Sequence, residues 1–114
     1  CRLAGIEMPV LNPPPDGEDM TDVFLGASRP RSRTLFWEWR YPITWHAADY
    51  DMPYLATREG PWKLFTETNG LGTLLYHVQS DPEERTNLVG HSEYSSLVEH
   101  LQTNLLNWKA TLPP

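Results

Sequence analysis

The chain has 114 residues, a formal net charge of −6 and an apolar share of 39% that includes five tryptophans. This length suits one domain of ordinary size. The acidic balance argues against nucleic acid or an anionic membrane as the main partner. No apolar run approaches the roughly 18 residues needed to span a bilayer. The single cysteine, Cys1, excludes an internal disulfide and a multi-cysteine zinc site.

The first residues have the pattern of a helix end. In "CRLAGIEMP", Gly5 is placed to cap a last turn and Pro9 follows shortly after it. We therefore expect the chain to be a fragment of a longer protein. The alternative is a disordered tail on a complete small protein.

The N-terminal region is expected to connect rather than to pack. Prolines and glycines predict an extended linker at 9–18, and Asp19 or Thr21 is placed to cap a short helix or turn. The basic stretch "SRPRSR" is interpreted as a solvated connector rather than an anion site. We assign residues 1–30 to this region and residues 31–114 to a folded subdomain.

Alternating side chains predict strands along the next part of the chain. In "TLFWEWR", one face would carry Leu35, Trp37 and Trp39, and the other Phe36, Glu38 and Arg40. We expect this strand to be central, with its tryptophan face in the core. The stretch "YPITWHAADYDMP" lacks periodicity and is predicted to be a long loop, which is where binding residues often lie.

A second run of alternation predicts a hairpin and one more strand. "PYLATR" and "PWKLFTE" flank a tight turn at Glu59 and Gly60, and Pro61 suits only the first position of its strand. "TNGLG" is a further turn, and "TLLYHV" a further strand.

Helical signals complete the chain. Asp81 can cap a helix that begins at Pro82, with Glu84 reaching back to the cap. Ser92 can cap a long helix through about Ala110, whose apolar stripe comprises Tyr94, Leu97, Val98, Leu101, Leu105, Trp108 and Leu112. The predicted fold class is α+β, an antiparallel sheet of about four strands packed by one long C-terminal amphipathic helix.

No self-sufficient active site is evident, and we assign no catalytic residue and no metal ligand. The four histidines have no metal-ligand spacing, and Cys1 is interpreted as an ordinary apolar residue. His46 stands out because Trp45, Asp49 and Asp51 share its loop and could line a polar pocket. Trp39 and Trp45 are candidates for stacking on a sugar, whereas Trp37 and Trp62 are predicted to be core.

Several segments together resemble a known family. In order they are "LAGIEMP", "DGEDMTDVFLG", "RPRSRTLFWEWR", "YLATREGPWKLF", "LLYHVQSDPEERTNL" and "HLQTNLLNWKATLP". They are similar to the C-terminal part of type I sulfatases, closest to arylsulfatase and N-acetylgalactosamine-6-sulfatase-like enzymes. The resemblance implies that family's small C-terminal subdomain, a four-stranded antiparallel sheet with a long terminal helix.

The resemblance also implies that the chemistry lies elsewhere. The family hydrolyses sulfate esters with a formylglycine made from a Cys-x-Pro-Ser-Arg-type motif and a calcium ion, both in a larger N-terminal domain. Cys1 does not match that motif, so no cofactor is expected in this chain. The implied partners are the N-terminal catalytic domain and, for the parent enzyme, a sulfated small molecule or glycan. The implied location is periplasmic, secreted or lysosomal.

Within such a subdomain the loops can reach the substrate entrance. By position, the candidates for that lip are Trp39, Arg40, Trp45 and His46. Many relatives have histidine where this chain has Trp39. The alternative function is a free-standing glycan-binding or interaction module, in which Trp39, Arg40, Trp45 and the basic loop would contact the ligand.

Overall fold

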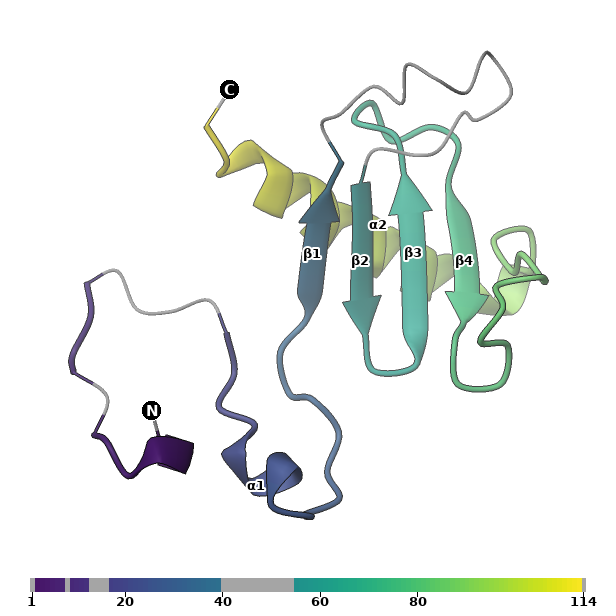
Figure 1. Ribbon diagram of the computed structural model, residues 1–114. Coiled ribbons are helices and arrows are strands. Elements are labelled where there is room, and N and C mark those ends of the chain that lie inside the picture. Colours follow the sequence, from purple (N-terminus) through teal and green to yellow (C-terminus); the bar gives the residue numbers. More distant parts are fainter. Residues whose placement is uncertain (1, 8, 13–16, 40–54, 114) are drawn as a thin grey trace, which may run out of the picture. The chain divides into compact units, whose positions relative to one another are not determined.

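The computed structural model describes residues 2–7, 9–12, 17–39 and 55–113. The chain divides into two compact units, Cys1–Arg33 and Thr34–Pro114. The second unit contains all of the strands in the described ranges and the one long helix, α2 (Figure 1).

The first unit contains little regular structure. A single turn of 3-10 helix, η1 (Arg2–Ala4), ends where Gly5 adopts a φ of +68° and its N–H donates to the carbonyl of Arg2. The short helix α1 (Thr21–Phe24) begins where the carboxylate of Asp19 accepts the N–H of Thr21 at 2.9 Å. None of the described residues in this unit is buried.

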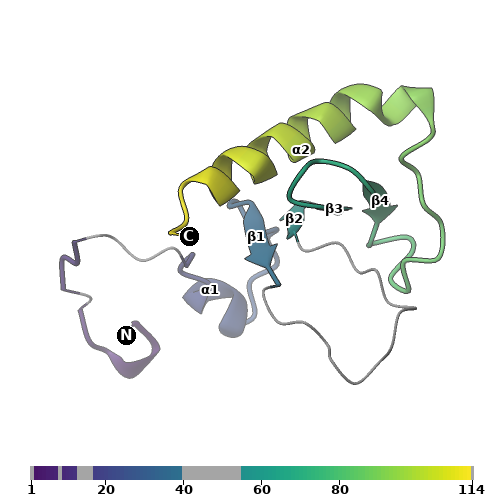
Figure 2. The same cartoon turned by 90° about the horizontal axis from the view of Figure 1, so that it is seen from above.

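The second unit is a sheet covered on one face by a helix. Strands β1 (Leu35–Glu38), β2 (Leu55–Glu59), β3 (Trp62–Thr66) and β4 (Leu74–His77) pair antiparallel in that order. After the 3-10 turn η2 (Ser92–Tyr94), helix α2 (Ser95–Ala110) lies across one face of the sheet (Figures 1 and 2). The predicted α+β fold of four antiparallel strands and one C-terminal helix is confirmed.

The core lies between the sheet and α2. Strand register aligns Thr57, Leu64 and Leu75 across β2, β3 and β4, on the face that α2 covers. Five leucines form the fully buried cluster: Leu55, Leu64, Leu75, Leu101 and Leu105. Burial of each leucine stabilises the folded state by roughly 1.5–3 kcal/mol of transfer free energy, so this cluster is what holds α2 on the sheet.

The prediction for β1 is wrong in two respects. The strand lies at the edge of the sheet, and the Trp37 side chain remains 45% exposed. Phe36, on the opposite face of the strand, stacks on Trp108 of α2 at 5.2 Å between ring centroids. Because successive strand residues point to opposite faces, packing Phe36 against the helix turns Trp37 away from the core.

The first hairpin turn lies one residue later than predicted. Glu59 still belongs to β2 and pairs with Trp62, so the two turn residues are Gly60 and Pro61. Gly60 adopts a φ of +56°, which only glycine takes without steric cost. Pro61 therefore precedes the ladder, where its missing N–H removes no strand hydrogen bond.

The predicted helix after Asp81 does not form. Glu84 has a φ of +54°, in the left-handed region, and this conformation ends the turn. The Asp81 carboxylate instead accepts the N–H groups of Arg85 at 3.1 Å and Thr86 at 2.9 Å. The residue types of a helix start are present, but here they build a loop.

The predicted cap of the long helix is also wrong. Ser92 begins the 3-10 turn η2 and makes no side-chain cap. Its carbonyl accepts the hydroxyl of Ser95 at 2.9 Å instead. The end of the helix at Ala110 agrees with the prediction.

A return segment protects one edge of the sheet. The N–H of Leu88 donates to the carbonyl of Leu75 at 2.8 Å, and the Asn87 side chain accepts the N–H of Leu75 at 3.0 Å. These bonds satisfy the outward backbone groups of β4 at Leu75, which would otherwise invite pairing with another chain.

Candidate functional site

The four predicted lip residues are not brought together by the described part of the structure. Trp39 follows β1 directly, and its side chain is 57% exposed. Arg40, Trp45 and His46 lie outside the described residues, as do Cys1, Asp49 and Asp51. The lip therefore remains a prediction, with only Trp39 placed.

The second face of the sheet, opposite α2, is the most distinctive surface of this unit. Within the described residues of Thr34–Pro114, no helix or strand covers it (Figure 2). Alternation along the strands assigns eight side chains to it: Leu35, Trp37, Ala56, Arg58, Lys63, Phe65, Leu74 and Tyr76. It is aromatic and apolar, and both of its charged side chains are basic.

Lys63 is the polar centre of the second face. Its ammonium lies 4.6 Å from the centroid of the Phe65 ring and 2.5 Å from a carboxylate oxygen of Glu84. Phe65 also meets Tyr76 edge to face, with centroids 6.1 Å apart. Burial, and then the negative charges of Glu84 and Asp81, raise the pKa of the Tyr76 hydroxyl above its ordinary value.

The carboxylate inside β1 is neutralised by α2. Glu38, on the helix side of the sheet, accepts from the ammonium of Lys109 at 2.6 Å, and its side chain is only 11% exposed. This contact fastens the end of the helix to the edge strand. Glu38 is also the only carboxylate in β1, so this strand does not supply the pair of carboxylates used in general acid–base catalysis.

A polar group lies where β2 ends beside α2. His100 Nε2 is 3.3 Å from a carboxylate oxygen of Glu59 and 3.1 Å from the amide nitrogen of Asn104. The Thr34 hydroxyl donates to the same Glu59 oxygen at 3.2 Å. The His100 and Glu59 side chains are about half exposed, so the group fastens the helix to the sheet at the surface.

His77 and Ser80 form the described contact that most resembles catalytic chemistry. Ser80 Oγ lies 2.7 Å from His77 Nδ1, and the Ser80 N–H donates to the same nitrogen at 3.3 Å. The ring also packs edge to face on Trp62. Among the described residues no carboxylate orients His77, which an activated serine normally requires. The contact stabilises the turn after β4.

Neither a metal centre nor a membrane helix occurs in the described ranges. They contain no group of three or more His, Cys, Asp and Glu side chains that could hold a metal ion. No helix there is both long and apolar enough to cross a bilayer.

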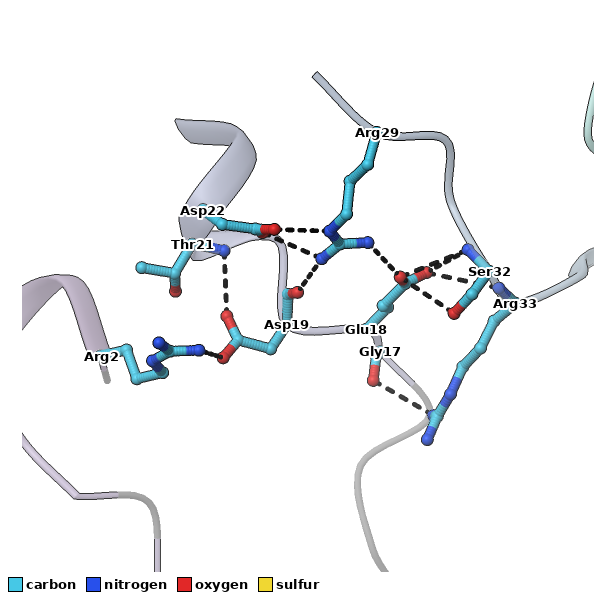
Figure 3. Close-up of polar contacts among 9 residues, drawn as sticks. All are labelled: Arg2, Gly17, Glu18, Asp19, Thr21, Asp22, Arg29, Ser32 and Arg33. Atoms are coloured by element: carbon cyan, nitrogen blue, oxygen red, sulfur yellow. Dashed lines mark hydrogen bonds and ion pairs between the residues drawn. The ribbon is translucent and has the colours of Figure 1, made fainter. Parts of the chain in front are cut away.

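The first unit is organised around Arg29 (Figure 3). Its guanidinium donates to both carboxylate oxygens of Asp22, at 2.6 and 2.9 Å, to Glu18 at 2.7 Å and to the carbonyl of Asp19 at 2.7 Å. Glu18 in turn accepts the N–H and hydroxyl of Ser32, at 3.0 and 3.1 Å. We call these four side chains, Glu18, Asp22, Arg29 and Ser32, the arginine clasp.

The clasp keeps its carboxylates charged. The hydrogen bond from Arg29 is the main cause that lowers the pKa of Glu18 to about 2, and donors on Ser32 and Arg33 add to it. The same guanidinium lowers the pKa of Asp22. Hydrogen bonds from Thr21, followed by the contact with Arg2, lower the pKa of Asp19. Arg29 of the basic stretch "SRPRSR" is therefore already paired with acidic residues of its own chain, Glu18 and Asp22.

Comparison with known proteins adds no relative. No protein-family model matches the chain, and a search of curated proteins finds no significant match.

Two features went unnoticed in the sequence, although each left a signal. Glu18 and Asp22 are spaced four residues apart and precede Arg29, so opposite charges were already close along the chain. The exposure of Trp37 had a weaker signal: Trp108 on the helix stripe favours an aromatic partner on a strand, but only the folded structure shows that Phe36 is that partner.

Proposed function

We propose that this chain is the C-terminal subdomain of a type I sulfatase, a sulfuric ester hydrolase. In this role it supports a separate catalytic domain and shapes substrate entry, and it does not hydrolyse sulfate esters alone. The catalytic formylglycine and the calcium site would belong to that other domain.

The observation that carries the proposal is the agreement between segment order and architecture. Four of the six segments that resemble sulfatases fall, in sequence order, on β1, the β2–β3 hairpin, β4 with its loop, and α2, and the other two lie in the first unit. That layout, a four-stranded antiparallel sheet with a terminal helix, is the one the resemblance implies. A fold alone does not establish a function, so the order of the motifs is the stronger part of the argument.

The surface of the sheet is consistent with a supporting role. An antiparallel sheet can leave one face in water, and that face is then usually polar. Here α2 covers one face, whereas the second face carries Trp37, Phe65 and Leu74 in one cross-strand row. An aromatic row of this kind suits contact with another protein domain.

The proposal is tested by activity and by genetics. The purified 114-residue chain should not turn over an aryl sulfate, even with calcium, and measurable turnover would overturn the proposal. The coding frame upstream should encode some hundreds of residues containing a Cys-x-Pro-Ser-Arg-type motif. A start codon close to Cys1 would favour a free-standing domain.

A second function is favoured by one observation. Trp37 and Trp39 are 45% and 57% exposed; if the extended backbone of β1 continued to Trp39, the two residues would lie about 6.8 Å apart on the same side. Exposed aromatic rings at this spacing can stack on successive sugar rings. In this alternative the chain is a glycan-binding module, and Arg58 on the same face would attract a sulfated sugar.

Tryptophan fluorescence distinguishes glycan binding from the sulfatase-subdomain proposal. Titration with sulfated oligosaccharides should shift the emission of the intact chain, and the shift should disappear in Trp37→Ala. The matched control is Leu71→Ala, an exposed residue in the turn after β3. No shift at millimolar ligand would count against glycan binding and leave the sulfatase proposal standing.

A further inference from the structure

The boundary between the two units falls in an arginine-rich segment. The first unit ends at Arg33 and the second begins at Thr34. Three of the five residues 29–33 are arginine. Residues 27–34 form no helix or strand, so no ladder of backbone hydrogen bonds holds this stretch.

The arginines on either side of Ser32 are accessible. Arg31 and Arg33 are both exposed, as is Ser32 between them. Exposed segments of irregular structure are the preferred sites of proteolytic cleavage, because a protease must draw several residues into an extended form. The arginine side chain also carries the charge that proteases with an acidic specificity pocket select.

The described restraints on this segment are polar contacts: those of Arg29 in the arginine clasp, the hydrogen bond from Thr34 to Glu59, and those that Glu18 makes with the residues between them. Glu18 accepts the backbone N–H groups of Ser32 at 3.0 Å and Arg33 at 3.3 Å. Arg33 also donates from its side chain to the carbonyl of Gly17 at 3.2 Å. None of these contacts involves a fully buried apolar side chain, so the segment can open while the leucine core of the second unit stays intact.

We propose that residues 28–34 form a processing site for an arginine-directed endoprotease, cut after Arg31 or Arg33. In the reaction water adds across the peptide bond, so the arginine carbonyl becomes a carboxylate and the next residue gains a free amine. The bond between Arg29 and Pro30 should resist, because a proline nitrogen carries a ring and no N–H. This inference does not depend on the sulfatase proposal.

Cleavage here would leave the second unit whole. All five leucines of its core and all four strands lie after Arg33. A cut after Arg33 would also keep Glu18, Ser32 and Arg33 on the same piece. The product would be a sheet-and-helix unit separated from the apolar side chains of the first unit, of which Leu3, Ile6, Phe24 and Leu25 are at least 60% exposed.

Arg85 provides an internal comparison. It is also exposed and its N–H is held by a carboxylate, that of Asp81. Its loop, however, is fastened to the sheet by the Leu88–Leu75 backbone bond and by the partly buried pair of Lys63 and Glu84. Cleavage after Arg85 therefore requires more of the fold to open.

The test is limited digestion of the full 114-residue chain with trypsin, followed in time by intact mass spectrometry. The first products should end at Arg31 or Arg33, and the complementary C-terminal piece should persist. Replacing both residues, in R31Q/R33Q, should slow the first cut by about tenfold or more, because trypsin requires a basic side chain before the cleaved bond. The matched control R85Q should leave the first cut unchanged. First cuts after Arg85 or Arg58 would overturn the proposal.

Two further measurements test the restraint by Glu18 and whether the chain is cleaved in its natural source. Glu18→Gln should speed the first cut severalfold while the circular dichroism of the sheet and helix stays unchanged, and an unaltered rate would refute the role given to Glu18. N-terminal sequencing of the protein from its natural source should find a chain beginning at Ser32 or Thr34. Uncut protein alone would overturn processing in the cell, whatever trypsin does.

Discussion

The two units of this chain are stabilised in opposite ways. In Thr34–Pro114, five buried leucines join α2 to the sheet, and the charged contacts, some exposed and some partly buried, lie around that core. In Cys1–Arg33, none of the described residues is buried, and the backbone is shaped by Arg29 and the carboxylates around it.

The difference shows what each kind of interaction can do. Burial of apolar surface is non-directional and supplies most of the free energy of folding. Charged hydrogen bonds near solvent contribute little stability but impose precise geometry. The second unit therefore has a buried core of its own, whereas the described residues of the first unit are held by polar contacts and include no buried residue.

The largest expected effect comes from removing part of the core. Leu64 is fully buried in β3 and packs against the leucines of α2. We expect Leu64→Ala to lower the free energy of unfolding by about 2–5 kcal/mol, through lost burial and the cavity that remains. Urea denaturation followed by far-UV circular dichroism measures this loss.

The matched control is another leucine in the same unit. Leu71 is 67% exposed in the turn between β3 and β4, so Leu71→Ala should change stability by less than about 0.5 kcal/mol. Equal losses for the two variants would contradict the assignment of the core.

The fold was predictable where periodicity was strong. The stripe of α2 repeats over sixteen residues, and only one face of such a helix can be buried. The hairpin of β2 and β3 was predicted from the turn at Glu59 and Gly60, although the turn lies one residue later. In both cases the pattern extends over several residues, and no distant contact overrides it.

The errors arose where a distant contact decided the outcome. Alternation in β1 showed that Phe36 and Trp37 point to opposite faces, but only the helix packing through Trp108 determines which face is inside. Similarly, Asp81 and Pro82 suit a helix start. The backbone of Glu84 is instead left-handed, and its carboxylate accepts a hydrogen bond from the ammonium of Lys63 in β3. Of the predicted lip, the structure describes Trp39 alone.

A smaller effect is expected at Glu84, which combines a charged contact with an unusual backbone. Its side chain and that of Lys63 are each a little over one-quarter exposed, so Glu84→Gln should cost about 0.5–1 kcal/mol. Glu84→Ala loses the same contact and keeps the steric cost of a positive φ. Glu84→Gly also loses the contact, but glycine adopts a positive φ without that cost. Glycine should therefore be more stable than alanine by about 1 kcal/mol. Equal stability of these two variants would show that the loop does not hold Glu84 in the left-handed region.

The smallest effect on global stability is expected from the arginine clasp, although its local pH dependence should be clear. The pKa of Glu18 falls from its ordinary value of 4.5 to about 2 in the folded chain. Because the folded pKa is the lower one, the contribution of this carboxylate is complete above pH 4.5 and is lost as the pH falls toward 2. The amide resonances of Ser32 and Arg33 should shift through that window.

Glu18→Gln separates this titration from general acid effects. It should abolish the acid-dependent shift at Ser32 and Arg33, while the amide of Leu64 in the core stays unchanged in both proteins. The urea midpoint of the second unit should also stay the same, because Glu18 contributes nothing to the leucine core. If Glu18→Gln instead destabilised the sheet and α2, the two units would be energetically coupled. The buried core of one unit and the charged contacts of the other would then not be independent.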